Sequence, residues 1–90
     1  MKQNKNESIT ASEEFKACLN YLQTKYKKLE LDVDEVAFEL SISKKELYKR
    51  ITNQSDCPFF IQKKRYDVIK IKIWDLAVYQ VSRVSTKTSN

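Results

Sequence analysis

The 90-residue sequence contains no glycine and no histidine, and it has one proline, one tryptophan and two cysteines. Without histidine, Cys18 and Cys57 are too few and too far apart to predict a zinc site. The lack of glycine excludes a glycine-rich phosphate-binding loop, and neither cysteine has a visible activating partner. We therefore expect no catalytic residue, no metal and no cofactor, and we predict that the protein is not an enzyme.

Long hydrophobic runs are also missing, so no segment predicts a transmembrane helix. The opening MKQNKNESIT lacks the apolar centre of a signal peptide, which predicts a cytoplasmic protein with two reduced, partly buried thiols. The hydrophobic fraction of 41% and the charged fraction of 32% are typical of a globular chain. Ninety residues correspond to one small domain.

Charge is distributed unevenly along the chain. Residues 1–42 carry six lysines and eight acidic residues, a balance of −2, whereas residues 43–72 carry nine basic and three acidic residues, a balance of +6. This division favours an anionic partner for the middle of the chain. A solvated face is the commoner explanation of any single lysine run, so charge alone does not decide between the two interpretations.

Apolar residues at three- and four-residue steps predict an amphipathic helix over residues 11–28. The residues of this stripe are Phe15, Cys18, Leu19, Leu22 and Tyr26. Thr10 and Glu13 have the spacing of a capping box, which predicts the start of the helix. We expect residues 1–10 to form a disordered tail.

Two further helix starts predict a helix-turn-helix over residues 32–52. The first start is at Asp32, which has capping-box spacing to Glu35, while Leu31 and Val36 are placed to form a hydrophobic staple. The helix that follows is short and has one apolar face. It ends at a break in the helical pattern.

The break is the stretch Ser41-Ile42-Ser43, and a second helix restarts directly after it. Ser43 and Glu46 again have capping-box spacing, and Ile42 is placed to pack inward. Leu47 and Ile51 then form the inner face of a helix that ends near residue 52. Its remaining residues are mostly basic.

The periodicity changes after residue 57 and predicts a β-hairpin over residues 58–71. Its strands, PFFI and VIKI, are rich in aromatic and β-branched residues, and the basic loop QKKRYD joins them. Helical spacing returns at Trp74 and predicts a helix over residues 73–84, followed by a disordered tail over 85–90. We expect Trp74 and the pair Phe59-Phe60 to lie in the core.

Residues 33–51, VDEVAFELSISKKELYKRI, resemble the opening of small winged-helix proteins of the excisionase, AlpA-like and MerR-like group. The pattern of that group begins with an acidic residue, an alanine and a leucine. A small residue, an aliphatic residue and a serine follow. Next comes a basic helix in which an aliphatic and an aromatic residue are adjacent. The positions that match are Glu35, Ala37, Leu40, Ser41, Ile42, Ser43, Lys44, Lys45, Leu47 and Tyr48.

Residues 57–79 are similar to the ending of the same family, which consists of proline, a strand, a basic wing, a second strand and an Asp-Leu helix; Asp75-Leu76 stands in the last place. The resemblance covers roughly residues 31–81 and leaves the first helix outside. The glycine usual in the turn and in the wing is missing, and Ser41 occupies the turn. Since a side chain disfavours positive φ, we expect a cost at this corner.

The resemblance implies a mainly α fold with a small β-hairpin (α+β), namely a winged helix-turn-helix with an extra N-terminal amphipathic helix. We expect a single domain over residues 11–84. The second helix of the helix-turn-helix would enter the major groove, and the wing would lie on the backbone or in the minor groove. The expected DNA-binding residues are Ser43, Lys44, Lys45, Tyr48, Lys49, Lys63, Lys64 and Arg65.

The expected function is sequence-specific binding of double-stranded DNA in the cytoplasm, on the nucleoid. The protein would act as an excisionase-like DNA-bending factor of a mobile genetic element or as a small transcriptional regulator, and the fold does not separate the two. Expected partners are DNA and either a second copy of the chain or a recombinase, without a membrane or a small-molecule ligand. The alternative is a protein-interaction module that uses the basic face, and RNA binding is less favoured because an aromatic ladder is missing.

Several of these residues have a second interpretation. For Ser43, capping the helix is favoured over contacting DNA bases. Tyr48 is also placed to pack against the wing. Arg50 is placed to pair with a carboxylate of the preceding helix. Lys70 and Lys72 fit the solvent face of an edge strand, where lysine discourages aggregation.

Overall fold

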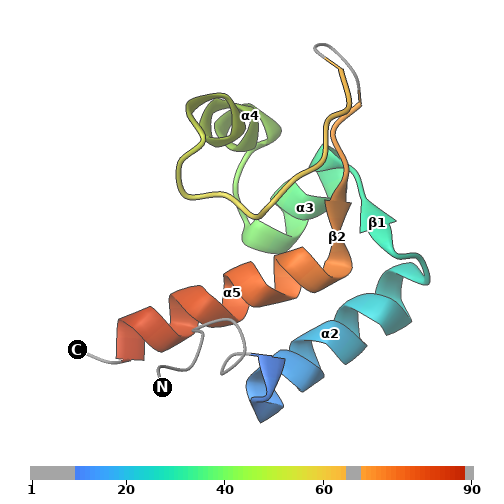
Figure 1. Cartoon of the computed structure of the whole chain (residues 1–90), viewed down its shortest axis with the longest axis vertical. Coiled ribbons are helices and arrows are strands. Elements are labelled where there is room, and N and C mark those ends of the chain that lie inside the picture. The colour runs from blue at the N-terminus through green and yellow to red at the C-terminus, as the bar shows by residue number, and fades with distance from the viewer. Residues whose placement is uncertain (1–9, 65–67, 89–90) are drawn as a thin grey trace.

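The computed structural model describes residues 10–64 and 68–88 (Figure 1). In this part of the chain four helices and one two-stranded antiparallel sheet make a mainly helical α+β fold. The predicted tail before Thr10 lies outside the described residues. The elements in chain order are α2 (Glu13–Tyr26), β1 (Glu30–Leu31), α3 (Val33–Leu40), α4 (Lys44–Asn53), β2 (Ile71–Lys72) and α5 (Ile73–Thr88).

The helix α2 packs along α5, although the two are separated in sequence by the α3–α4 pair (Figure 1). Phe15 and Leu22 of α2 are buried in the core that all helices share. The helix begins at Glu13 because the Oγ of Ser12 accepts a hydrogen bond from the Phe15 N–H at 3.1 Å. The prediction that Thr10 caps this helix is therefore wrong.

The predicted starts of α3 and α4 are confirmed. Asp32 accepts from the Glu35 N–H at 2.9 Å, and the Glu35 carboxylate accepts from the Asp32 N–H at 3.0 Å, which completes a capping box. The Oγ of Ser43 accepts from the Glu46 N–H at 3.0 Å. Ile42, between the two helices, is half-buried against the core, as its staple position predicts.

Three helices end in the left-handed conformation without glycine. The φ angles are 56° at Lys27, 59° at Ser41 and 51° at Gln54, and each of these residues donates its backbone N–H to a carbonyl of the preceding turn. A side chain makes this conformation unfavourable by roughly 1–2 kcal/mol. The cost expected at the Ser41 corner is therefore present there and recurs at two other helix ends.

We expect Ser41→Gly and Gln54→Gly each to raise the free energy of unfolding, by about 0.5–1 kcal/mol. The gain is smaller than the full left-handed penalty because glycine also increases the entropy of the unfolded chain. Urea unfolding followed by circular dichroism measures it. Ser41→Ala, which keeps a Cβ atom, is the matched control, and an equal gain in that variant would contradict the explanation.

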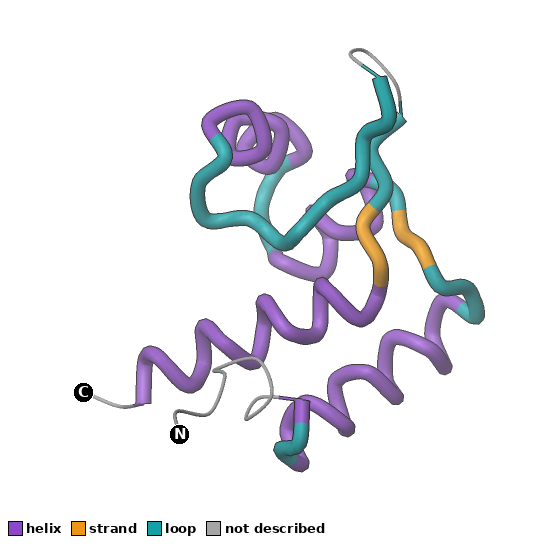
Figure 2. The backbone as a smooth tube through the Cα atoms, viewed as in Figure 1, coloured by secondary structure: helices purple, strands orange, loops and turns teal. Residues whose placement is uncertain are grey.

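The sheet joins the segment after α2 to the segment before α5. β1 pairs with β2 so that Glu30 lies opposite Lys72 and Leu31 opposite Ile71. The sequence did not predict β1, because two residues are too few to show a period. Lys70, directly before β2, pairs instead with Ile61. The chain therefore runs from the predicted hairpin straight into β2 (Figure 2).

The predicted hairpin over residues 58–71 differs from the structure in its pairing. Ile61 and Lys70 exchange both backbone hydrogen bonds, at 2.7 and 3.0 Å, but they form an isolated bridge. In the part of the chain that is described, the pairing between the predicted strands PFFI and VIKI is therefore reduced to this bridge, and Ile71, the last residue of VIKI, pairs with β1 instead. The end of the loop, residues 65–67, lies outside that part.

The core is aliphatic and lies between the helices and the inner face of the sheet. Its buried members include Phe15, Leu22, Leu31, Val36, Leu47, Ile51, Ile71, Leu76 and Ala77. Two predicted core residues are wrong, because Trp74 is 49% exposed and Phe59 is 69% exposed, while Phe60 is half-buried. α5 continues to Thr88, past the predicted end at residue 84 and into the predicted tail.

A buried carboxylate fixes α3 against α2. The side chain of Glu39 is 6% exposed. Its Oε2 accepts hydrogen bonds from Lys25 at 2.8 Å, from the Tyr26 hydroxyl at 2.5 Å and from the Tyr21 hydroxyl at 3.4 Å. Gln80 of α5 donates to the Glu39 carbonyl at 3.3 Å, so that three helices meet at this residue.

The ionisation of these groups is coupled. Burial raises the pKa of Glu39, but the hydrogen bonds from Lys25 and Tyr26 outweigh burial, and the pKa lies below its ordinary value of 4.5. The hydrogen bond to Glu39 raises the pKa of Lys25. Burial, together with the bond to Glu39, raises the pKa of Tyr26 to about 12. The network is therefore charged near neutral pH.

Candidate nucleic-acid interface

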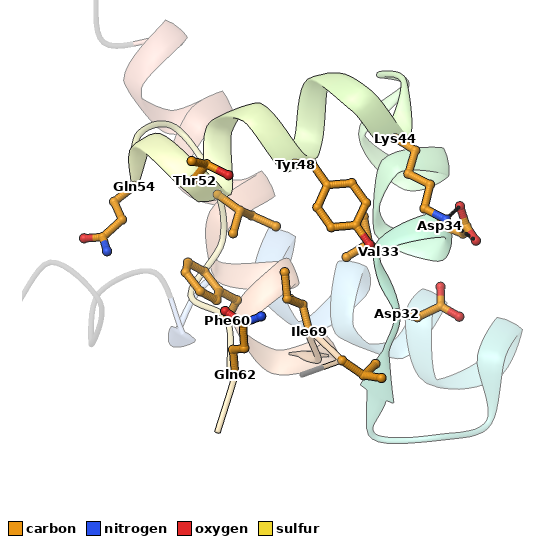
Figure 3. Close-up of a pocket in the computed structure, with 12 residues that line it drawn as sticks. Asp32, Val33, Asp34, Lys44, Tyr48, Thr52, Gln54, Phe60, Gln62 and Ile69 are labelled. Carbon is orange, nitrogen blue, oxygen red and sulfur yellow. Dashed lines mark hydrogen bonds and ion pairs between the residues drawn. The ribbon is translucent and has the colours of Figure 1, made fainter. Parts of the chain in front are cut away.

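An open groove of about 690 Å³ separates α4 from the segment between residues 60 and 69 (Figure 3). One wall comes from α4 and the residue after it: Lys44, Tyr48, Ile51, Thr52 and Gln54. The opposite wall comes from Phe60, Gln62, Val68 and Ile69, and one end is closed by Asp32, Val33 and Asp34.

α4 presents two polar faces around one buried stripe. Leu47 and Ile51 face the core, with exposed fractions of 0% and 5%. Lys45 and Lys49, four residues apart, are exposed on the side away from that stripe. Lys44, Tyr48 and Thr52 repeat the same spacing and line the groove. The helix therefore carries an outer basic face beside a mixed face that turns toward the hairpin.

Tyr48 turns toward the hairpin, as its second interpretation predicts, while its role in DNA binding stays a prediction. Its side chain extends from α4 into the groove above Ile69 (Figure 3). The residue remains 42% exposed. The Lys44 ammonium lies 5.9 Å from the centre of the Tyr48 ring, which gives the ring a cationic neighbour. A ring placed in this way can pack on a sugar or a thymine methyl while its hydroxyl reaches a phosphate.

Lys44 forms an ion pair that the sequence did not predict. Its Nζ lies 3.3 Å from Asp34, and the two side chains are 52% and 66% exposed. Exposed pairs of this kind contribute roughly 0–1 kcal/mol, so the pair can open when a stronger anion approaches. Lys44 is therefore a weaker candidate for a strong DNA contact than Lys45 or Lys49.

Arg50 is held in the protein, as its second interpretation predicts, although its partners differ from the expected ones. It bonds to Glu46 of its own helix at 3.0 Å and lies 3.5 Å from Asp56 in the following loop. The bond to Glu46 and the charge of Asp56 together outweigh burial and raise the pKa of Arg50. Tyr79 of α5 donates to Asp56 at 2.8 Å, which ties α4 to α5.

The predicted wing residues fall into two groups. Lys63 and Lys64 are exposed on the loop between Ile61 and Lys70, which projects beyond the sheet beside α4 (Figure 1). Arg65 lies outside the described residues, and its predicted role stays a prediction. Ser43 caps α4 through its hydroxyl. The structure thus brings Lys44, Tyr48 and the hairpin together across one groove.

The sequence missed several groove residues, of which Thr52, Gln54 and Gln62 are polar. A signal for Thr52 existed, because it follows Lys44 and Tyr48 at two successive four-residue steps. Gln62 had no such signal, since its position depends on the isolated bridge at Ile61 and not on a regular strand.

The thiols offer little chemistry. Burial, and for Cys18 also the charge of Glu39, raises the pKa of both cysteines, which disfavours the reactive thiolate. Within residues 10–64 and 68–88 no three potential ligand side chains gather at a metal-binding distance. None of the helices described there has the length and apolarity needed to span a membrane.

Comparison with known proteins gives no match to this chain among family models, curated proteins or solved structures. A function therefore has to be inferred from the charge, exposure and placement of the residues described above.

Proposed function

We propose that the protein binds double-stranded DNA as a winged helix-turn-helix module and has a binding role, not a catalytic one. α4 would enter the major groove, and the loop between Ile61 and Lys70 would act as the wing on the backbone or in the minor groove. The observation that carries the proposal is the exposure of Lys45 and Lys49 on the outer face of α4, whose opposite face is buried. The sequence resemblance to excisionase-like proteins points the same way.

The proposed DNA-contacting residues have different roles according to their side-chain chemistry. Lys45 and Lys49 would neutralise phosphates or donate to guanine acceptors in the groove. Tyr48 and Thr52, which turn toward the hairpin, would contact the edge of the same groove. Lys63 and Lys64 would hold the backbone beside it, since ammonium groups bind phosphate as point charges.

Two biological roles would use this same DNA-binding surface. The protein would act either as a DNA-bending factor in excisive recombination or as a small transcriptional regulator. A single module of this size covers little DNA, and its specificity would come from copies on neighbouring sites. Protein binding through the basic face, the alternative named above, would require an acidic protein partner in place of DNA.

A fluorescence anisotropy titration tests the proposal. Labelled duplex from the DNA that flanks the protein's own gene is compared with scrambled duplex at two salt concentrations. We expect tighter binding to the native sequence, and a log–log salt slope of about −0.9 for each phosphate contacted. Equal weak binding to both duplexes would contradict sequence specificity, and no binding at low salt would overturn the proposal.

A further inference from the structure

A second groove lies on a different part of the molecule, between α2, the turn that follows it and the start of α5. Its volume is about 750 Å³. It shares no lining residue with the groove beside α4. The lining residues are Leu19, Gln23, Lys28, Leu29, Glu30, Lys70, Lys72, Ile73 and Trp74.

The lining of this groove includes two large apolar side chains that are exposed. Leu29 is 74% exposed and Trp74 is 49% exposed. The Trp74 ring is held in place by an edge contact with the buried Phe15, at 4.8 Å between ring centres. A rigid, half-exposed tryptophan beside an exposed leucine is the type of anchor that dominates protein–protein interfaces.

The rim of the groove is basic because successive side chains of the extended segment around β2 point alternately toward the core and toward solvent. Ile69, Ile71 and Ile73 face the core, and Lys70 and Lys72 therefore face outward, next to Trp74. Lys28 adds a third cation, although it also bonds to Glu35 at 2.9 Å. Glu30 is the one carboxylate in the lining as the structure describes it.

We propose that this groove docks an acidic amphipathic helix of another protein. Leucine-like side chains at three- and four-residue steps would cover Leu29 and Trp74, and carboxylates on the flanks of the helix would face Lys70 and Lys72. The described lining holds three lysines and one carboxylate, Glu30, which lies opposite Lys72. An acidic helix would balance this excess of positive charge, whereas a basic or neutral helix would not.

A second copy of the chain fits this groove less well. The exposed apolar patch formed by Phe38 and Tyr21 carries its own cation, because Lys25 lies 4.5 Å from the centre of the Phe38 ring. Lys25 is paired with Glu39, so this patch supplies no free carboxylate to the rim lysines. The exposed apolar residues beside α4, Tyr48 and Val68, likewise lie in a segment rich in lysine.

The proposal does not depend on DNA binding. The DNA-facing residues proposed above lie on α4 and at Lys63 and Lys64 of the hairpin loop, while the second groove is lined by residues of α2, the turn after it, β1, the β2 segment and the start of α5. Both surfaces are available at the same time, so the protein could hold DNA and an acidic partner together.

Trp74 is the only tryptophan in the chain, and its fluorescence reports directly on the groove. The probe is a synthetic, tryptophan-free acidic amphipathic peptide of about 15 residues, a length at which an isolated helix begins to form. Its control is a scrambled peptide of the same composition. We expect a saturable blue shift with the amphipathic peptide and none with the scrambled one.

The charged rim is tested with Lys70→Glu/Lys72→Glu, which should weaken peptide binding at least about tenfold. Lys44→Glu/Lys45→Glu makes the same change of charge on α4 and should leave peptide binding within about twofold, because those lysines lie outside the groove. Circular dichroism verifies that both variants fold.

Three results would overturn the proposal: an equal shift with the scrambled peptide, a shift unaffected by charge reversal at the rim, or no shift at all. A blue shift that depends on protein concentration without peptide would also overturn it and assign the groove to a second copy. None of these results depends on the DNA titration, so the two proposals fail separately.

Discussion

Replacing Lys45 and Lys49 together with alanine is expected to weaken DNA binding by at least about 100-fold. Each substitution removes a charge-assisted contact worth roughly 1.5–3 kcal/mol, and 1.4 kcal/mol corresponds to a factor of ten in affinity. Both lysines are exposed on the face of α4 that lies away from the buried Leu47–Ile51 stripe. Folding should therefore be preserved while the proposed recognition surface is lost.

Anisotropy titrations at several salt concentrations measure this effect. The log–log salt slope should become shallower by about 2 if both lysines contact phosphates. Lys16→Ala/Lys72→Ala removes the same charge from α2 and β2 and should change affinity by less than about threefold, because screening limits the reach of exposed charges to about 10 Å. Equal losses in both double variants would mean that only the total charge matters and would contradict a recognition role for α4.

Replacing Glu39 with alanine is expected to lower the free energy of unfolding by about 2 kcal/mol, or roughly 10 °C in Tm. The substitution leaves Lys25 and Tyr26 without their shared acceptor at a site where the carboxylate side chain is 6% exposed. It also loosens the contact of α3 with α2. Urea and thermal unfolding followed by circular dichroism measure the loss.

Glu14→Ala is the matched control, because it removes an exposed carboxylate from the first turn of α2. Its cost should stay below about 1 kcal/mol, the usual limit for a charge at a helix end. If Glu39→Ala costs no more than this control, the buried network does not hold the helices together.

The same network predicts a dependence of stability on pH. Because folding lowers the pKa of Glu39, its contribution is complete above the ordinary value of 4.5 and is lost as pH falls through the lower pKa of the folded state. Because folding raises the pKa of Tyr26, its contribution is complete below pH 10 and is lost as pH rises toward about 12. Glu39→Gln should flatten both limits in a series of unfolding curves, and an unchanged profile would contradict the assignment.

The features that could be predicted from the sequence are those fixed by local chemistry. Ser43 and Asp32 were predicted to cap α4 and α3 because a short polar side chain at that position satisfies a free N–H of the first turn. Leu47 and Ile51 were predicted to face inward because helical spacing places them on one stripe. These choices depend on neighbours three or four residues away, which the sequence displays directly.

The features that could not be predicted depend on contacts between distant parts of the chain. Leu31 joins a strand only because Ile71 lies opposite it, and neither segment is long enough to predict the pairing. Trp74 was predicted to lie in the core, but its ring only makes an edge contact with the buried Phe15 and stays half-exposed. Lys44 was predicted to be a free DNA contact, and Asp34, ten residues earlier, pairs with it.

The packing of α2 along α5 has a consequence for the order in which the protein is made. Phe15 and Leu22 emerge from the ribosome early, but the helix that covers them emerges only after the α3–α4 pair and the hairpin have been synthesised. At roughly 5–20 residues per second, the apolar face of α2 waits several seconds for its partner. The core around α2 therefore closes only after α5 has been made, and the apolar face of α2 is open to aggregation until then.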